Sequence, residues 1–515
     1  MSFFLNCLIF QIVHGAFTEV FRGNWSKEQF PNETFFMVDK ISAYGHVSMT
    51  HEFPIGTYEV SLIFYGSNRC LTCRFLSTPC VAFCNQTHKY LIFCASILLR
   101  LVYFQIITDF PGLTITNDEI TLLNGKIIKG IALVRCYAPK KFMFPIIPFK
   151  TKSGQTVWTL CAVCAEKEAK KKCNHNQFQR SWIVTLCTHE IVYAAKYGYK
   201  FDFFEAYVYK NHDFLLRDYI STLASYKIKN SGLPKDFSKT EQETFVSNIN
   251  TKMKFENALK LEPKDFKNNP EKRLMFKSLI TGALGKFLQK KPDPCKTVYV
   301  STGEEIEAIL QQNQIINICD LSDNVCELVV QTQNKKNTKP SRKTNCIIGS
   351  YVVSFCRIEI HKDIVDLEKN GFLVYMVDTD SIAFAGLNSL QIPLSIGPCF
   401  GDFKHEYSSI KSFKAIGRKM YNVTWGETQT LHNTVKMSGL NLNSALNSNS
   451  IEPQYFKDCQ DETKKLDKHV TQCRRFVKNK RCHEKMINFK VKNGVSFNRK
   501  IMTSSPRFES LPFGF

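Results

Sequence analysis

The sequence predicts an α+β protein with several subdomains and a central antiparallel sheet that carries an acidic site. An apolar, strand-like run at residues 374–377 leads into Asp378-Thr379-Asp380-Ser381, and a second apolar run follows at 382–384. This is the pattern of a buried β-hairpin with acids at its tip. Helical patterns at 180–195 and 240–262 supply the α component. A chain of 515 residues exceeds what one hydrophobic core organises.

The first part of the chain is predicted to form strands with a turn at Gly23-Asn24, ending in an apolar run just before Asp39. The apolar opening lacks a basic segment before it, so it is interpreted as a strand rather than a signal peptide. Residues 66–110 are apolar and Cys-rich without a clear period, which indicates a genuine insertion or translated non-coding sequence. The apolar stretch 91–107 has Arg100 near its middle, which disfavours a membrane span.

Later segments continue the mixed pattern. Strand signals resume at 127–134, and Asn-Pro-Glu at 269–271 predicts the start of a helix. Residues 330–345 are polar and basic and are interpreted as an exposed loop. A helix from Gly349 to about residue 367 is predicted to lead into the acidic hairpin, and residues 440–470 are expected to form a linker or loop.

Composition favours a polyanionic partner. The net charge is +22, from 68 Lys and Arg against 46 Asp and Glu, and basic residues occur throughout the chain. Nucleic acid is the first candidate and an anionic membrane surface the second. The 20 cysteines lack the regular spacing of small disulfide modules, so we expect reduced thiols in an intracellular protein that is not secreted.

Two groups of residues are candidate metal ligands. Asp378 and Asp380 are two apart on a strand and can converge on a hard cation such as Mg²⁺, although a solvated turn explains the tetrad alone equally well. A candidate zinc knuckle is formed by the closely spaced residues Cys161, Cys164, Cys173 and His175. Thiolates and an imidazole at such spacings can complete a tetrahedral structural Zn²⁺ site. Reduced structural cysteines are the alternative interpretation.

Four motifs follow one another along the chain: Asp39-x4-Tyr44, Arg273-x3-Lys277-x3-Thr281, Asp378-Thr379-Asp380-Ser381 and Lys419-x-Tyr421. This order resembles motifs A, B and C and the Lys-x-Tyr motif of family B DNA polymerases. The resemblance extends from about residue 14 to 440 and is greatest to the protein-primed branch of viruses, linear plasmids and self-replicating transposons. The exonuclease domain of that family is not expected, because motif A begins only 39 residues into the chain.

The resemblance implies a right-hand polymerase with palm, fingers and thumb. The implied organisation is: 1–65, N-terminal palm segment with motif A; 66–110, Cys-rich insertion; 111–210, insertion-type region with the candidate zinc knuckle; 211–290, fingers with motif B; 291–345, second insertion or loop region; 346–430, palm with motif C and Lys-x-Tyr; and 431–515, basic thumb-like region.

The implied activity is DNA-directed DNA polymerisation in DNA replication. A 3′-hydroxyl attacks the α-phosphate of a deoxynucleoside triphosphate, with two Mg²⁺ ions, or Mn²⁺ in their place, about 4 Å apart. The implied partners are primer-template DNA, deoxynucleoside triphosphates and a terminal-protein primer, with no membrane. The expected location is the nucleus or the site where a viral or mobile element replicates.

The resemblance also assigns roles to residues. Asp39 and Asp380 would bridge the metal ions, with Asp378 as a supporting catalytic acid. Tyr44 would lie under the incoming sugar. The nucleotide-binding residues would be Arg273, Lys277 and Thr281, and the DNA-binding residues Lys419 and Tyr421, which alternate on a predicted strand, and Lys436. The alternatives are a core tyrosine at position 44 and a solvated helix face for Arg273 and Lys277.

Several positions differ from the family pattern: Gly45 stands where Pro is usual, Thr281, Gly282 and Leu284 replace Asn, Ser and an aromatic residue, and Met376 replaces a Tyr. Two rival functions therefore stay open. The first is a catalytically inactive, nucleic-acid-binding remnant of such a polymerase. The second is an RNA-directed polymerase, although the usual Tyr-x-Asp-Asp tip does not match Asp378-Thr379-Asp380.

Overall fold

A computed structural model describes much of the chain: residues 15–62, 113–115, 119–122, 128–288, 295–311, 313–322, 325–332, 345–427, 429–438, 453–460, 469–478, 481–490, 495, 497–502 and 504–515. The predictions for the chain's opening, for the insertion 66–110 with its apolar stretch, and for most of the loop 330–345 and the start of the linker 440–470 lie outside the described residues.

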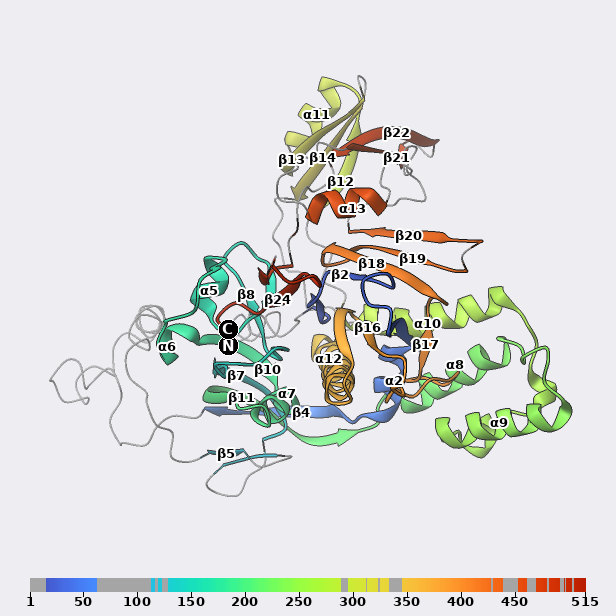
Figure 1. The fold of residues 1–515 in the computed structure, drawn as a ribbon. Helices are drawn as coiled ribbons and strands as arrows, with labels where there is room; N and C mark the ends of the chain where they lie inside the picture. Colours follow the sequence, from blue (N-terminus) through green and yellow to red (C-terminus); the bar gives the residue numbers. More distant parts are fainter. Residues whose placement is uncertain are drawn as a thin grey trace.

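The predicted α+β class is confirmed, since helices and sheets both occur (Figure 1). All strand pairings within the named sheets are antiparallel. A five-stranded sheet contains β1 (Thr18–Val20), β15 (Leu373–Asp378), β16 (Ser381–Leu387), β3 (Glu33–Lys40) and β17 (Phe403–His405). One four-stranded sheet contains β10 (Trp182–Cys187), β7 (Gly130–Tyr137), β11 (Lys200–Asp213) and β4 (Phe53–Leu62), and another contains β2 (Asn24–Ser26), β18 (Ile410–Gly417), β19 (Met420–Trp425) and β20 (His432–Met437). A three-stranded sheet contains β12 (Cys295–Val300), β14 (Val325–Thr332) and β13 (Asn313–Ser322).

The remaining strands form two-stranded sheets: β5 (Leu113–Ile115) with β6 (Ile120–Leu122), β8 (Pro148–Lys150) with β9 (Thr156–Trp158), β21 (His469–Lys478) with β22 (Arg481–Lys490), and β23 (Lys500–Met502) with β24 (Glu509–Leu511). The helices are α2 (Ala43–Thr50), α5 (Ala162–Glu166), α6 (Gln177–Arg180), α7 (Thr188–Ala195), α8 (Arg217–Lys229), α9 (Lys239–Met253), α10 (Pro270–Leu288), α11 (Gly303–Leu310), α12 (Cys346–Lys369) and α13 (Pro453–Gln460), with 3₁₀ turns η2 (Asn257–Leu259) and η3 (Pro263–Asp265).

The five-stranded sheet, here called the acidic sheet, has the order β1-β15-β16-β3-β17. Its centre is the predicted hairpin, which is confirmed: β15 ends at Asp378, and β16 begins at Ser381. The strands are apolar on both faces because both faces are covered. A register shift between Val374 and Met376 lets the consecutive residues Tyr375 and Met376 join the same hydrophobic cluster.

Helix α12 covers one face of the acidic sheet, and the sheet β2-β18-β19-β20 covers the other (Figure 1). Ile360 and Ile364 of α12 share a buried cluster with Phe384 on the first face. On the second face, Phe413 of β18 stacks on Phe35 of β3, with ring centroids 5.0 Å apart. The acidic hairpin is therefore held between two apolar layers, which fixes where its tip projects.

A third sheet, β10-β7-β11-β4, lies beside α7 and α12. The helix prediction for 180–195 is wrong over residues 182–187, because these residues form strand β10 of this sheet. The prediction is correct from Thr188 onward, where α7 begins. The side chains of β10 are buried on both faces except for Ile183. A strand buried on both faces has no alternating pattern, so it resembles a helix segment in sequence.

Helices α8, α9 and α10 form a layer at the right of Figure 1, packed against α2 and α12. The predicted helix start at Pro270 is confirmed. The predicted helix 240–262 ends early, because Lys254 takes a left-handed conformation with φ 50° and two 3₁₀ turns follow. A Cβ on Gly45 of α2 would lie 3.0 Å from Ile280 and 3.1 Å from Phe400, so this close packing explains glycine at that position.

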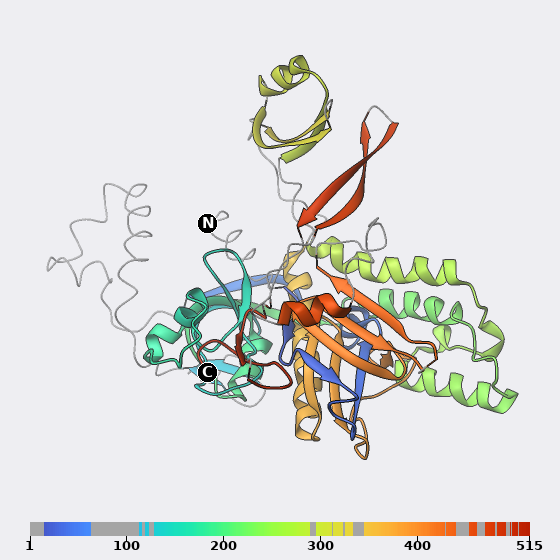
Figure 2. The same cartoon turned by 45° about the horizontal axis from the view of Figure 1, so that its top comes forward.

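The predicted helix before the hairpin is confirmed and extends over the whole of α12. Region 291–345, expected to be an insertion or loop, contains α11 and the sheet β12-β14-β13. In Figure 2 this small unit and the β21–β22 hairpin project from the rest of the molecule. None of the helices in the described parts of the chain combines the length and apolar character needed to cross a membrane.

Candidate active site

The three predicted acids meet at one end of the acidic sheet. In the pairing of β16 with β3, Ser381 stands opposite Asp39, and the Ser381 hydroxyl donates a 3.1 Å hydrogen bond to Asp39 Oδ1. The Lys40 amide donates to the carbonyl of Asp380 at 2.8 Å. Thr379 forms the tip with a left-handed φ of 66°. Asp39 of β3, Asp378 at the end of β15 and Asp380 in the turn before β16 are thus brought to one end of the sheet, although Asp380 was predicted to share a strand with Asp378.

The surroundings of Asp380 perturb its carboxyl group. Burial, together with the negative charges of Asp39 and Asp378, raises its pKa to about 6. A half-buried carboxylate among like charges is stabilised by a cation, and hard divalent ions favour such oxygen ligands. Asp39, Asp378 and Asp380 therefore fit a Mg²⁺ site.

Two lysines contact these acids. Lys404 Nζ lies 3.0 Å from Asp39 Oδ2, and Lys419 Nζ lies 2.9 Å from Asp378 Oδ1. Both lysine side chains are more than half exposed. Ion pairs of this kind contribute about 0–1 kcal/mol each, so a divalent cation can displace them. Lys404 was not predicted from the sequence.

The prediction that Lys419 lies on a strand is wrong. Lys419 occupies the turn between β18 and β19 with a left-handed φ of 56°, and β19 begins at Met420. Tyr421 does lie on β19, as predicted, and pairs with Lys436 of β20. The tight turn is what directs the ammonium of Lys419 toward Asp378.

Two tyrosines face the acids. Burial raises the pKa of Tyr44, and Asp380 and Asp378 contribute to that rise. Burial also raises the pKa of Tyr421, with contributions from Glu406 and both Asp378 and Asp39. Tyr44 lies in α2, directly after β3, and Tyr421 enters from the sheet on the opposite side. The site thus has an aromatic side chain on either side of its carboxylates.

Glu406 is a fourth acid at this site that sequence reasoning missed. Burial raises its pKa, the charge of Asp39 adds to the rise, and Lys404 and Lys436 oppose it. Glu406 directly follows β17, and its amide donates to the carbonyl of Met37 at 2.9 Å. No spacing in the sequence relates it to the other acids, because β17 reaches β3 only through the fold.

A group of cations gathers between the helical layer and Asp39. Burial and the charges of Arg273, Lys277 and Lys404 together lower the pKa of Lys227 in α8 to about 8, and the charge of Asp39 opposes them. The ammonium of Lys227 donates a 2.6 Å hydrogen bond to the Ser42 hydroxyl. A buried ammonium beside other cations is a favourable position for a polyanion.

The residues assigned to motif B, Arg273, Lys277 and Thr281, differ in what their side chains contact. Arg273 and Lys277 are exposed on α10, and both act electrostatically on Lys227. Arg273 also donates to the Ser231 hydroxyl at 3.2 Å. The Thr281 hydroxyl donates to the carbonyls of Lys277 and Ser278 in its own helix. The structure therefore brings Arg273 and Lys277, but not the Thr281 hydroxyl, toward the acids.

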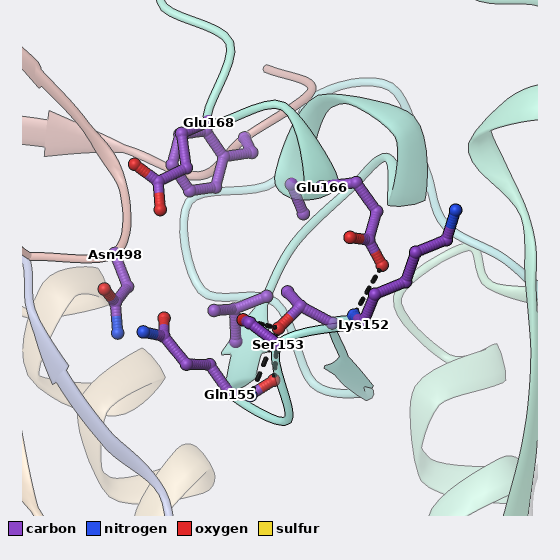
Figure 3. A pocket seen from close by; sticks show the side chains of 10 residues that line it. Lys152, Ser153, Gln155, Glu166, Glu168 and Asn498 are labelled. Atoms are coloured by element: carbon purple, nitrogen blue, oxygen red, sulfur yellow. Dashed lines mark hydrogen bonds between the residues drawn. The ribbon is translucent and has the colours of Figure 1, made fainter.

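The candidate zinc ligands form a separate cluster. The ligand atoms of Cys161, Cys164, Cys173 and His175 all lie within 4.8 Å of one another. A pocket next to this cluster, seen in Figure 3, is lined by the β8–β9 turn, α5, Asn498 and Phe513. Its lining includes none of the predicted catalytic, nucleotide-binding or DNA-binding residues.

Fold and site together define an α+β protein with a carboxylate site at the tip of an antiparallel hairpin, flanked by cations and tyrosines. No protein-family model matches the chain, and no curated protein matches it. The solved structures that are similar over 96% of this chain, with 13% sequence identity, include Phi29 DNA polymerase in an orthorhombic crystal form (TM-score 0.48), in complex with single-stranded DNA (0.48), and in a ternary complex with primer-template DNA and incoming nucleotide substrates (0.47). This chain matches 63% of the length of those chains.

Proposed function

We propose that this protein is a DNA-directed DNA polymerase that adds deoxynucleotides to a 3′-hydroxyl by a two-metal-ion mechanism. The observation that carries the proposal is the meeting of Asp39 of β3 with Asp380 of the β15–β16 turn, where Ser381 stands opposite Asp39 and the half-buried Asp380 has a pKa of about 6. Two metal ions require acids from more than one strand. The choice of DNA rests on the resemblance of the four motifs to family B polymerases.

The acids would hold two Mg²⁺ ions, or Mn²⁺ in their place. Asp39 and Asp380 are the proposed bridging ligands, and Asp378 supports them. When bound, the ions would activate the attacking hydroxyl and stabilise the leaving pyrophosphate. Asp378 is fixed by hydrogen bonds from Thr18 at 3.3 Å and Thr379 at 3.2 Å, which orient its Oδ1 within the site.

The cations opposite the acids are suited to a triphosphate. Lys227, Arg273 and Lys277 approach from the helical layer, which in this proposal forms the fingers, and the acidic sheet forms the palm. Tyr44 lies on the same side of the acids, where its ring would support the sugar of the incoming nucleotide. Charge-assisted hydrogen bonds to phosphate oxygens would orient the α-phosphate toward the metal site.

The DNA would lie on the opposite side, over β19 and β20. Lys419, Tyr421 and the exposed Lys436 are the proposed contacts to the primer strand. Contacts to the phosphate backbone carry no sequence preference, in keeping with the basic character of the whole chain. By resemblance to the protein-primed branch, we propose that a hydroxyl of a terminal protein can serve as the first primer.

Primer extension with the purified full-length protein tests the proposal. We expect template-directed addition of deoxynucleotides to a DNA primer with Mg²⁺ or Mn²⁺, abolished by a chelator. If neither metal supports addition while the protein still binds primer-template, the protein is an inactive nucleic-acid-binding remnant. Efficient copying of RNA in place of DNA would instead identify the RNA-directed alternative.

Metal binding is expected to depend on pH through Asp380. Because its pKa is raised to about 6, the carboxyl is ionised above that pH and increasingly protonated below it. A proton competes with the metal, so the affinity for Mn²⁺ should be constant well above pH 6 and fall about tenfold per pH unit below it. Titration with Mn²⁺, followed by electron paramagnetic resonance, measures this effect. Asp380→Asn should bind weakly and lose this pH dependence; a dependence unchanged in the variant would contradict the assignment.

Lys227→Met is expected to raise the KM for deoxynucleoside triphosphates by at least about tenfold, with a smaller change in kcat. The reason is the loss of one charge-assisted hydrogen bond to the triphosphate, worth about 1.5–3 kcal/mol. Methionine keeps the aliphatic contact with Phe400, whose ring centroid lies 4.5 Å from the lysine nitrogen. Lys239→Met, on an exposed residue of α9, is the matched control. Equal KM values for the two variants would exclude Lys227 from the nucleotide site.

A further inference from the structure

We propose that Cys161, Cys164, Cys173 and His175 bind one structural Zn²⁺ ion, and that this zinc site fastens the C-terminal residues 509–515 to the body of the protein. The site is separate from the carboxylates of the candidate active site. It would be a Cys₃His centre, in which three thiolates and one imidazole complete the tetrahedron.

The geometry of the cluster matches a tetrahedral centre. His175 Nδ1 lies 3.5 Å from the sulfur of Cys161, 3.4 Å from that of Cys164 and 3.5 Å from that of Cys173. With Zn–S near 2.3 Å and Zn–N near 2.0–2.1 Å, tetrahedral ligand atoms are roughly 3.5–3.8 Å apart. The observed separations are therefore those of ligands around one ion.

Reduced structural thiols explain this arrangement less well. A ring nitrogen carries at most one proton, so the Nδ1 atom of His175 can donate to only one of the three sulfurs. Three sulfurs that converge on one nitrogen without a shared cation leave most of these contacts unexplained. Local structure supports the cluster: Cys161 is the N-cap of α5, and the Cys164 amide donates to its sulfur at 3.5 Å.

Arg180 provides the outer support that a thiolate-rich zinc site needs. Its guanidinium is buried and donates to the sulfur of Cys173 at 3.1 Å. Three thiolates and one Zn²⁺ leave a net charge of about −1, which the guanidinium offsets. The same Arg180 nitrogen donates to the carbonyl of Gly514 at 2.9 Å. One side chain thus joins a proposed ligand to the C-terminal segment.

The C-terminal segment packs directly on the cysteine cluster. Phe513 is buried in one hydrophobic cluster with Cys161 and Cys164, and its carbonyl accepts hydrogen bonds from the Leu160 amide and the Thr159 hydroxyl, both at 2.9 Å. Gly514 has a left-handed φ of 92°, and a Cβ there would lie 2.5 Å from the Cβ of Cys161. Asn498 and Phe513 also line the pocket beside α5 (Figure 3). A side chain at position 514 would therefore separate the two segments.

The same segment reaches the acidic sheet. Ser510 of β24 donates from its hydroxyl to the carbonyl of Val20 at 2.8 Å, and its amide donates to the carbonyl of Phe21 at 2.8 Å. Val20 belongs to β1, the strand that pairs with β15. Zinc at the cysteine cluster would hold the Phe513–Gly514 end of this C-terminal strap, residues 509–515, and its loss would release that end from the cluster.

Metal analysis of the full-length protein, purified after growth with zinc, is the first test. We expect one zinc per chain, and Co²⁺ in its place should give the visible absorption of a tetrahedral thiolate site. Cys164→Ser and His175→Ala should lose the zinc. His175→Cys, which can rebuild a four-ligand site, should keep it, as should the control Cys346→Ser. Absence of zinc, iron in its place, or full zinc content in His175→Ala would overturn the proposal.

Hydrogen exchange then tests the fastening, independently of any polymerase activity. In Cys164→Ser, or after removal of zinc by a chelator, amides of residues 509–515 should exchange at least about tenfold faster, whereas those of the central strand β16 should be unchanged. A variant that failed to fold would lose protection in β16 as well. In that case, exchange of the wild-type protein after removal of zinc by the chelator is the measurement that tests the fastening. Unchanged protection of 509–515 after zinc removal would overturn the fastening role.

Discussion

Asp380→Asn is expected to lower the rate of nucleotide addition by at least about 1,000-fold, to the background of the assay. The substitution keeps the size of the side chain but removes the charge that would hold both metal ions. Metal stabilisation of the transition state is worth several kcal/mol, and each 1.36 kcal/mol changes the rate about tenfold. Single-turnover primer extension measures the effect on the chemical step.

Two comparisons make this result specific. Asp39→Asn should be equally defective, because Asp39 is the second proposed bridging ligand and contributes to the raised pKa of Asp380. Asp366→Asn, on the exposed face of α12, removes the same charge away from the site and should have wild-type activity. All three variants should unfold at similar temperatures. Activity that survives Asp380→Asn would rule out the two-metal assignment for these acids.

The central part of the site could be predicted from sequence because its signals are local. An apolar strand, a pair of acids two apart and another apolar strand occur together at 374–384, so the hairpin and its tip are visible without the rest of the fold. The start of α10 at Pro270 and the four proposed zinc ligands are equally local. In each case the residues that act together are close in sequence, and their spacing defines the geometry.

Residues that reach the site through the fold could not be predicted. Lys227 lies in α8, Lys404 lies in β17, and Glu406 directly follows β17. Nothing near them in sequence distinguishes them from other lysines and glutamates. The same is true of the C-terminal strap, since Gly514 and Arg180 are 334 residues apart. The left-handed turn at Lys419 was missed because lysine rarely adopts that conformation.

Arg357→Met is expected to lower the local stability of α12 by about 3–5 kcal/mol. Arg357 of α12 and Glu190 of α7 form an ion pair, with exposed side-chain fractions of 6% and 2%. Removing one partner of a buried pair leaves the other charge in a medium of low polarity, which accounts for the size of the cost. The exchange free energies of α12 amides measure the loss without assuming a two-state transition for the whole chain.

The double variant Glu190→Leu/Arg357→Met distinguishes the attraction between the two charges from the cost of burying one charge alone. Removing both charges leaves neither carboxylate nor guanidinium buried alone, so the double variant should be more stable than Arg357→Met, with a coupling energy of about 1 kcal/mol or more. Glu190 also accepts a 3.4 Å hydrogen bond from the Cys187 amide at the start of α7, so part of the loss should remain. If the double variant is as unstable as the sum of the single variants, the contribution of Arg357 lies in its other contacts, such as its 3.2 Å hydrogen bond to the carbonyl of Gly15, and not in the ion pair.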